Sequence, residues 1–462
     1  MRYISTRGRA PEAGFIDVLL AGLASDGGLY APAAWPTLGT PEIAAFAGRP
    51  YAEVAADILG LFAGEEIDAE TLRRICQRAY AGFSHPAVAP LRQLAPGRFL
   101  LELFHGPTLA FKDVAMQVLG GLFEHALALR GRSMTIVAAT SGDTGGAAAS
   151  AFANLAGVRL VVLYPEGRVS EVQRRFMTTT GADNVRCVAV DGDFDACQAI
   201  VKALFADEAF ARESELAAVN SINLARIAAQ CVYYFTAAVA LGAPARPVAF
   251  AVPTGNFGDA YAGWAARRMG LPIDRIVVAT NANDIVARAL TDGIYRRGRT
   301  VATQSPAMDI QVASNFERLH FEYAGRGNLE TADAYEAFAR TGEISLPPAI
   351  RAAMAEVFEG RSVSEAATTE AMRRAWGETG ELIDPHTAVA LAGADAATPL
   401  SARTPLVVLS TAHAAKFPEA VAAAAGLAPD VARVEALGRL SERFDRLPAD
   451  AEAVKAYVRG WP

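Results

Sequence analysis

Cysteine and histidine are scarce in this sequence, which limits the disulfide and metal chemistry that it can support. Only four of the 462 residues are cysteines and six are histidines. The cysteines form no Cys-x-x-Cys pair, and neither residue type recurs at the spacing of a zinc site or a disulfide framework. We therefore expect no metal, and we interpret the thiols as buried and reduced, as is typical of a cytoplasmic protein.

Charge and long apolar runs are also limited, which excludes two classes of partner. Charged residues make up 20% of the chain and the formal net charge is −7, so no basic stripe for nucleic acid is expected. The longest apolar run, residues 227–241, contains Gln230 and falls short of the about 20 residues that a membrane span needs. The N-terminal segment MRYISTRGRAPEAG has no apolar core of an export signal. These features predict a cytoplasmic protein that binds neither nucleic acid nor membrane.

What the sequence does contain is a repeated alternation of strand and helix patterns. Its length of 462 residues, 52% of them hydrophobic, suits two or three domains. From residue 133 onward, continuous apolar segments alternate with helical patterns, which is typical of parallel sheets covered on both faces. The expected strands are residues 135–140, 158–165, 185–190, 248–253, 276–280 and 405–410. Residues 1–90 instead predict helices, among them 42–61 and 69–80, and the less regular region 291–380 predicts an insertion or peripheral helices.

The segment LELFHGPTLAFKD, residues 101–113, contains the main catalytic candidate. Gly106 and Pro107 interrupt an apolar stretch, and residues 112–130 then follow the spacing of a helix. Lys112 would lie at the helix start among apolar side chains, where burial and the helix dipole both disfavour its charged form. A neutral lysine amine is a nucleophile. The alternative is an ordinary solvated lysine that opens a helix.

Two glycine-rich turns predict anion-binding sites at the ends of expected strands. The first, ATSGDTGG (residues 139–146), would direct backbone N–H groups and the hydroxyls of Ser141 and Thr144 at one spot. In the second, TGNFGD (residues 254–259), glycines allow the backbone to approach a phosphate closely. Neither matches a nucleotide-binding fingerprint, and each has the alternative of an ordinary strand-to-helix turn.

A third segment, STAHAAKF (residues 410–417), places hydroxyls at the end of the last expected strand. A hydroxyl at a strand end can hydrogen-bond a heteroaromatic nitrogen without forcing a proton onto it. We interpret His413 as a loop histidine bonded to backbone. Asp384-Pro385-His386 predicts a helix cap followed by proline. DGDFD, residues 191–195, predicts a solvated helix start, because it lacks the spacing of a calcium loop.

Together, FHGPTLAFKD, SGDTG, GNFGD and STAH resemble the motifs of threonine synthases, in the longer branch found in bacteria and fungi. The resemblance extends from Gly22 to Phe417 and includes the loop GLASDGGLYAP, residues 22–32, of an N-terminal extension. The sequence departs from the family at Ala414, where proline is usual. The resemblance implies an α/β enzyme of fold type II that uses pyridoxal 5′-phosphate (PLP), similar to tryptophan synthase β, with two parallel-sheet domains and a helical N-terminal extension.

The resemblance also implies a role for each motif. Lys112 would hold PLP as an imine and serve as general base. The phosphate of PLP would be surrounded by Gly255, Asn256, Phe257, Gly258 and Asp259, and its pyridine nitrogen would meet Thr411. The substrate's α-carboxylate would be held by Ser141, Gly142, Asp143 and Thr144. Many PLP relatives have asparagine where Asp143 stands.

The implied reaction converts O-phospho-L-homoserine and water to L-threonine and phosphate, the last step of threonine biosynthesis. The substrate brings a second phosphate, which needs its own cation because burying an unpartnered dianion is very costly. Arg226 or Lys416, with Ser221 and Asn223, are the candidates, although Arg226 has the alternative of a surface arginine. The alternative functions are another fold-type II lyase, such as a threonine dehydratase or a sulfhydrylase, and a non-catalytic homologue that binds phosphorylated metabolites.

These patterns predict a domain organisation and an assembly. Residues 1–90 are expected to form the N-terminal extension, 91–132 with 245–425 a large PLP-binding domain, 133–244 a small α/β domain, and 426–462 a C-terminal tail. The expected partner is the small-molecule substrate, and the chain is expected to be a monomer or a weak homodimer.

Overall fold

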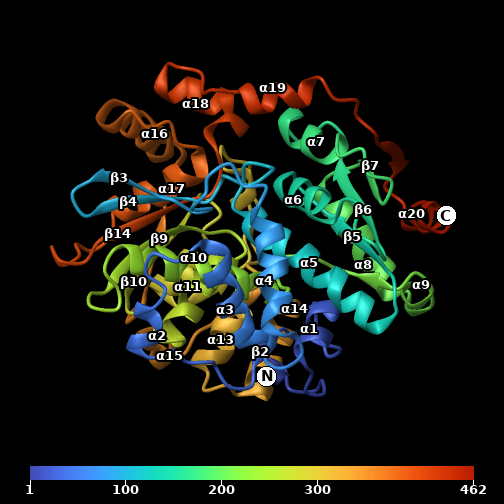
Figure 1. The fold of residues 1–462 in the computed structure, drawn as a ribbon, viewed down its shortest axis with the longest axis horizontal. Helices are drawn as coiled ribbons and strands as arrows, with labels where there is room; N and C mark the ends of the chain where they lie inside the picture. Colours follow the sequence, from blue (N-terminus) through green and yellow to red (C-terminus); the bar gives the residue numbers. More distant parts are fainter. Residues whose placement is uncertain (462) are drawn as a thin grey trace.

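Two β-sheets organise the chain in the computed structural model, which describes residues 1–461 (Figure 1). The larger sheet has six strands in the order β13-β10-β9-β14-β4-β3 and is parallel except for the antiparallel pair β3–β4. Its strands are β3 (Leu91–Ala95), β4 (Arg98–Glu102), β9 (Val248–Pro253), β10 (Ile273–Thr280), β13 (Phe358–Ser362) and β14 (Leu406–Ser410).

The smaller sheet has five strands, all parallel, in the order β15-β7-β6-β5-β8. Its strands are β5 (Met134–Ala139), β6 (Val158–Pro165), β7 (Val185–Asp191), β8 (Leu216–Ala217) and β15 (Asp445–Pro448). Figure 1 shows this sheet on the right and the larger one on the left, with α5 (Lys112–Arg130) and α6 (Asp143–Phe152), which pack on each other, between them.

Burial on both faces explains why these strands lack a polar alternation. Every residue of β9 is buried, and so is every residue of β6 except Arg159. A parallel strand covered by helices on both faces must be apolar at consecutive positions, whereas a half-exposed strand alternates. The expected α/β class with two parallel sheets is therefore confirmed.

Helices cover both sheets, and short antiparallel pairs form at the periphery. The other helices are α1 (Phe15–Ala21), α2 (Thr40–Ala44), α3 (Tyr51–Ala63), α4 (Ala69–Tyr80), α7 (Glu171–Thr178), α8 (Phe194–Ala206), α9 (Glu208–Glu213), α10 (Leu224–Ala240), α11 (Gly258–Arg268), α12 (Ile285–Asp292), α13 (Phe316–Tyr323), α14 (Asn328–Thr341), α15 (Pro348–Ala355), α16 (Glu365–Thr379), α17 (Pro385–Asp395), α18 (Pro418–Ala425), α19 (Ala432–Gly438) and α20 (Ala451–Arg459). The short pairs are β1 (Tyr3–Ser5) with β2 (Tyr30–Pro32), and β11 (Ile294–Arg296) with β12 (Glu343–Ser345). Two 3₁₀ turns are η1 (Pro306–Met308) and η2 (Ala414–Lys416).

The single helix expected over residues 42–61 is wrong, because the segment forms the two helices α2 and α3. Between them, Gly48 adopts a left-handed φ of 72° and Pro50 occupies the N-cap of α3. Proline has no N–H for a helix interior and disfavours helical geometry in the residue before it. The apolar period alone does not reveal such a break.

Residues 426–461 are more than the expected C-terminal tail, because they add a strand to the smaller sheet. β15 pairs in parallel with β7 and completes the smaller sheet, while α20 packs on α8 and α19 on α7. The remaining strands of the smaller sheet lie within residues 133–244. β15 has the sequence DRLP, which is too short and polar to be recognised, because its stability comes from an existing sheet edge rather than from its own apolar pattern.

The region 291–380 is also more integrated than the predicted peripheral helices. β13 forms one edge of the larger sheet, and Arg318 of α13 is fully buried.

Among residues 1–461, no helix is both long and apolar enough to cross a membrane, and no group of three or more His, Cys, Asp or Glu side chains is arranged to hold a metal ion.

Candidate active site

The lysine segment and the STAH segment lie side by side, although about 300 residues separate them in the sequence. Ala110 and Ala412 form an antiparallel bridge. The N–H of Phe111 donates to the carbonyl of Thr411 at 2.8 Å, next to Lys112, which begins α5. These backbone bonds bring Thr411 close to the start of α5.

A buried carboxylate shapes the turn that precedes Lys112. Thr108 donates to Asp113 with both its N–H, at 2.8 Å, and its hydroxyl, at 2.7 Å. A Cβ on Gly106 would lie 2.3 Å from the Cβ of Asp113, so only glycine fits there. Burial raises the pKa of Asp113 to about 6, although the hydrogen bonds from Thr108 favour its ionised form. Asp113 thus holds the Gly-Pro-Thr turn against the helix that presents Lys112.

Lys112 combines burial with a nearby carboxylate. Its side chain is only 12% exposed, and its Nζ lies 3.7 Å from Oδ2 of Asp143 at the start of α6. Burial lowers the pKa of Lys112, and the charges of Lys416 and Arg226 lower it further, whereas Asp143 and Asp259 oppose them. A lowered pKa increases the fraction of neutral amine, the nucleophilic form.

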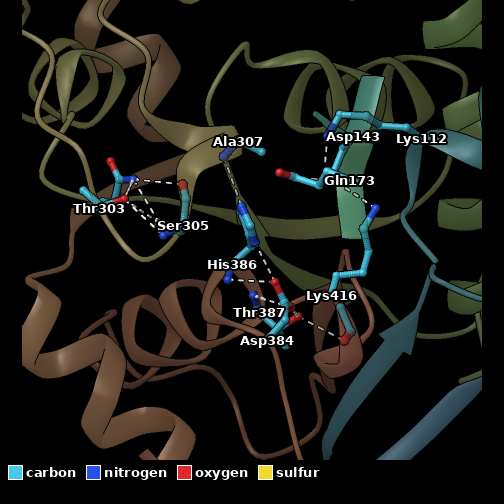
Figure 2. Close-up of polar contacts among 12 residues, drawn as sticks. Lys112, Asp143, Gln173, Thr303, Ser305, Ala307, Asp384, His386, Thr387 and Lys416 are labelled. Atoms are coloured by element: carbon cyan, nitrogen blue, oxygen red, sulfur yellow. Dashed lines mark hydrogen bonds and ion pairs between the residues drawn. The ribbon is translucent and has the colours of Figure 1, made fainter. Parts of the chain in front are cut away.

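Asp143 is held by three side chains from three different elements (Figure 2). Besides Lys112, it meets Lys416 Nζ at 2.7 Å and Gln173 Nε2 at 3.1 Å. Burial alone would raise the pKa of Asp143, but the ammonium groups of Lys416 and Lys112 outweigh burial and hold the pKa well below its usual range. Asp143 is therefore ionised, and its side chain is committed to cations rather than to a substrate carboxylate.

The SGDTG loop offers fewer free donors than its sequence indicates. Thr140 Oγ1 accepts from the N–H groups of both Gly142 and Gly145 at 2.9 Å. Gly142 has a φ of 139°, and a Cβ there would lie 2.4 Å from Gln173. Ser141 is exposed and Thr144 is partly exposed. The hydroxyls of these two residues are the polar groups of the loop that a ligand can reach.

In the TGNFGD loop, packing and a backbone hydrogen bond fix the conformation of Asn256 and Phe257. Phe257 adopts a left-handed φ of 62°, and its fully buried ring packs between Phe316 and Phe358. The carbonyl of Asn256 accepts from the N–H of Asn315 at 3.1 Å. Gly258 then begins α11, whose N-terminal N–H groups are suited to an anion.

Three buried polar atoms, in carboxyl, guanidinium and amide groups on α10 and α11, have no hydrogen-bond partner among residues 1–461. They are Oδ2 of Asp259, Nε of Arg226 and Oε1 of Gln230, and a Cβ on Gly258 would lie 3.7 Å from the last of these. Burial raises the pKa of Asp259 to about 7, so its protonated carboxyl is available as a donor near neutral pH. Arg226 Nε and a protonated Asp259 carboxyl can donate to a phosphate, whereas the amide oxygen of Gln230 accepts. Unpaired buried polar groups are costly unless a ligand satisfies them. The residues present therefore fit a phosphate-bearing ligand.

The four residues predicted to bind a second phosphate differ in how far their polar side-chain groups already have partners within the protein. Asn223 caps α10: its side chain accepts from Ala225 N–H and donates to the carbonyl of Leu19, so it is not a free donor. Lys416 is committed to Asp143 and to the carbonyl of Thr108, at 2.9 Å. Ser221 is partly buried.

Arg226 is the exception among these four. It is 3% exposed, and its one hydrogen bond within residues 1–461 runs from its guanidinium to the carbonyl of Val219 at 3.3 Å. Burial lowers the pKa of Arg226 to about 10, which still leaves it charged at neutral pH. It is not the surface arginine of the alternative interpretation, and its charge has no carboxylate partner in this part of the chain.

Two features of the site escaped sequence analysis. Gln173 forms a capping box with Ser170, a signal visible in the sequence, but its amide also reaches Asp143. Asp384 caps α17 as expected, yet it also binds the imidazole of His386 at 2.6 Å. The second partner of Gln173 comes from a different helix, α6, whereas the second partner of Asp384 lies two residues along the chain. The interpretation of His413 is confirmed, since its Nδ1 accepts from Ala415 N–H.

Comparisons with known proteins identify the family of this chain. Residues 2–80 match the family Threonine synthase N terminus, residues 89–412 the family Pyridoxal-phosphate dependent enzyme, and residues 387–458 the family Threonine synthase, C-terminal. The threonine synthase of Pseudomonas aeruginosa is 48% identical over 460 residues, covering 99% of this chain and 98% of that protein.

Solved structures show the same likeness. A PLP-bound threonine synthase from Brucella melitensis has a TM-score of 0.97 at 46% identity, with 99% of both chains covered. Yeast threonine synthase has a TM-score of 0.93 at 36% identity, covering 99% of this chain and 98% of that one. The expected fold-type II architecture and the family resemblance are confirmed. The chain therefore belongs to the threonine synthase family of pyridoxal-phosphate-dependent lyases.

Proposed function

We propose that this enzyme converts O-phospho-L-homoserine and water to L-threonine and inorganic phosphate, with Lys112 as the residue that binds PLP. The observation that carries the proposal is the buried Lys112 amine, whose Nζ lies 3.7 Å from the ionised carboxylate of Asp143 and whose pKa the charge of Arg226 helps to lower. The threonine synthase matches at both ends of the chain favour this reaction over that of a dehydratase or a sulfhydrylase.

Each part of the site would hold one part of the cofactor. The Lys112 amine would bind its aldehyde carbon, the N–H groups of residues 255–259 its phosphate, and the hydroxyl of Thr411 its pyridine nitrogen. When bound, PLP supplies an electron sink for the pair left at the substrate's α-carbon after loss of its proton. A hydroxyl rather than a carboxylate at the pyridine nitrogen leaves that nitrogen free of an imposed proton.

Lys112 is the group placed to move protons. Its amine, once released by the substrate, would remove the α-proton and return protons during turnover. Asp143 would stabilise the resulting ammonium form, since it remains ionised through its pairing with Lys416 at 2.7 Å. This gives Asp143 a role beside the lysine, which replaces its expected role as a ligand for the substrate carboxylate. The hydroxyls of Ser141 and Thr144 would bind that carboxylate.

Arg226 is the proposed ligand of the substrate's own phosphate. It is a buried cation with one hydrogen bond among residues 1–461, to the carbonyl of Val219, and its charge acts on Lys112. In the overall reaction the bond between Cγ and the phosphate oxygen breaks, the phosphate leaves, and a hydroxyl from water adds at Cβ. A cation at the phosphate favours that departure by stabilising the leaving dianion.

The proposed setting is the cytoplasm, with the chain acting as a monomer or a weak homodimer. Cys76, Cys187, Cys197 and Cys231 are all buried free thiols, which supports a reducing compartment. The relatives are biosynthetic enzymes by name, and the small-molecule substrate is the only partner the proposal requires.

The proposal is tested by incubating the PLP-loaded protein with O-phospho-L-homoserine and quantifying phosphate and threonine in the same sample. Equal molar yields of the two are expected. Phosphate release with α-ketobutyrate instead of threonine would indicate a dehydratase-like lyase. Binding of the substrate without either product would indicate the non-catalytic alternative.

The variant Gly258→Ala tests the phosphate-binding loop. An added Cβ would meet Asn315 Nδ2 at 3.5 Å and other protein atoms beyond that, which are ordinary contacts, so the fold should accept it. It would however intrude where the backbone must approach a phosphate, and we expect PLP affinity to fall about tenfold or more. Titration of the apoprotein with PLP, followed by visible absorption, measures the effect.

Gly377→Ala is the matched control, because Gly377 also lies in a helix and a Cβ there meets nothing within 4 Å. It should leave PLP affinity unchanged. If Gly258→Ala retains wild-type affinity, the TGNFGD loop is only a turn.

A further inference from the structure

A buried histidine at the start of α17 binds the backbone of the η1 turn, which lies beside the TGNFGD loop. His386 is 3% exposed and Asp384 is fully buried. Figure 2 shows the imidazole between the Asp384 carboxylate and the backbone of Ala307, on the side of the site opposite Lys112. The side chain comes from α17, the last helix before β14, and Ala307 lies 79 residues earlier in the sequence.

The hydrogen bonds determine which imidazole nitrogen accepts. His386 Nδ1 lies 2.6 Å from Asp384 Oδ2, and a carboxylate can only accept, so Nδ1 carries the proton. Nε2 is then free to accept, and the N–H of Ala307 donates to it at 3.2 Å. Asp384 therefore sets the tautomer in which His386 receives a backbone N–H.

Ala307 lies directly against the TGNFGD loop. A Cβ built on Gly255 would lie 3.0 Å from the carbonyl oxygen of Ala307 and 3.1 Å from Cα of Met308. The η1 turn is therefore one wall of the proposed phosphate loop. The segment that leads into this turn is held by Asn281, whose amide donates to the hydroxyls of Thr303 and Ser305. The turn itself is held by His386, which accepts from the N–H of Ala307.

The same helix start also reaches the other end of the cofactor site. Thr387 shares the Asp384 carboxylate with His386, and its hydroxyl lies 3.0 Å from that of Ser410, the neighbour of Thr411. One capping residue thus links the turn behind the phosphate loop with the strand end that carries Thr411.

We propose that His386 is a positioning residue for PLP, which through its Nε2 holds the backbone of Ala307 where the TGNFGD loop needs it. His386 is not a catalytic residue, since it acts through Ala307 and Gly255. The inference rests on the proposed placement of PLP. Helix capping alone does not account for the imidazole, because Asp384 already accepts from the N–H groups of His386 and Thr387.

The test compares His386→Met with His386→Gln. The two side chains have similar volume, but only glutamine has an acceptor that reaches as far as Nε2. PLP affinity is measured by titrating each apoprotein and recording the visible absorption band, and urea unfolding of the apoproteins is measured in parallel. We expect PLP affinity to fall about tenfold in His386→Met, since the Ala307 N–H loses its acceptor, and to stay within about threefold of wild type in His386→Gln.

His320→Met is the matched control, because His320 is also buried but packs on Tyr335 of α14. It should leave PLP affinity unchanged. Wild-type PLP affinity in His386→Met would overturn the proposal, and so would an equal loss in His386→Met and His386→Gln. The readout is PLP binding without substrate, so a wrong assignment of the substrate would leave it unaffected, whereas failure of wild-type protein to bind PLP would overturn both.

Discussion

Replacing Lys112 by alanine is expected to abolish covalent PLP binding and to lower turnover by about three orders of magnitude or more. The variant loses both the amine that binds the cofactor and the proposed base. The fold should persist, because Lys112 occupies the first position of α5, where alanine is a good helix former, and such truncations typically cost about 1–3 kcal/mol. Turnover of O-phospho-L-homoserine, the visible absorption band and urea unfolding measure the three parts of this prediction.

Borohydride reduction identifies the lysine directly. The chain has four lysines: Lys112, Lys202, Lys416 and Lys455. Of these, Lys112 and Lys416 are the two that lie beside Asp143 in the site, so they are the two candidates for the imine with PLP. Lys416→Met is therefore the matched control and should retain the PLP label on Lys112. Recovery of the label on Lys416 in the wild-type protein would refute the assignment.

Replacing Arg226 by methionine is expected to raise KM for O-phospho-L-homoserine by about ten- to a hundredfold and to weaken inhibition by free phosphate. The magnitude corresponds to one or two hydrogen bonds from a charged donor to the phosphate. Methionine fills a similar apolar volume in the buried site, and it removes a charge that has no carboxylate partner among residues 1–461. PLP content and the visible band should not change, because the cofactor's phosphate is proposed to bind at residues 255–259.

Lys416→Met separates the two candidate cations. Lys416 already meets Asp143 and the Thr108 carbonyl, so its loss should perturb Asp143 and the amine of Lys112, with a larger effect on kcat than on KM. A selective rise in KM for Lys416→Met, with none for Arg226→Met, would transfer the phosphate site to Lys416. Wild-type KM and phosphate inhibition in both variants would mean that the site is wrongly placed.

Much of the architecture could be predicted because it depends on contiguous patterns. Helix α5 runs from Lys112 to Arg130 and α4 from Ala69 to Tyr80, as their apolar periods indicate, and β6 and β9 have the predicted bounds. β15 and the break between α2 and α3 were missed. β15 gains its hydrogen bonds from the edge of an existing sheet, and the break depends on a glycine and a proline that interrupt an otherwise helical pattern.

The sequence by itself determined the fold class, the family and the candidate lysine, because apolar strands, glycine turns and the lysine motif are local features. Only the tertiary structure decided which charged side chains remain available. Lys416 donates to the carbonyl of Thr108, 308 residues away in the sequence, and pairs with Asp143 of the smaller domain, whereas Arg226 is buried without such a partner. The physical reason is that the energy of pairing a buried charge depends on its distance from groups that packing brings close to it. The spacing of residues along the chain does not encode this distance.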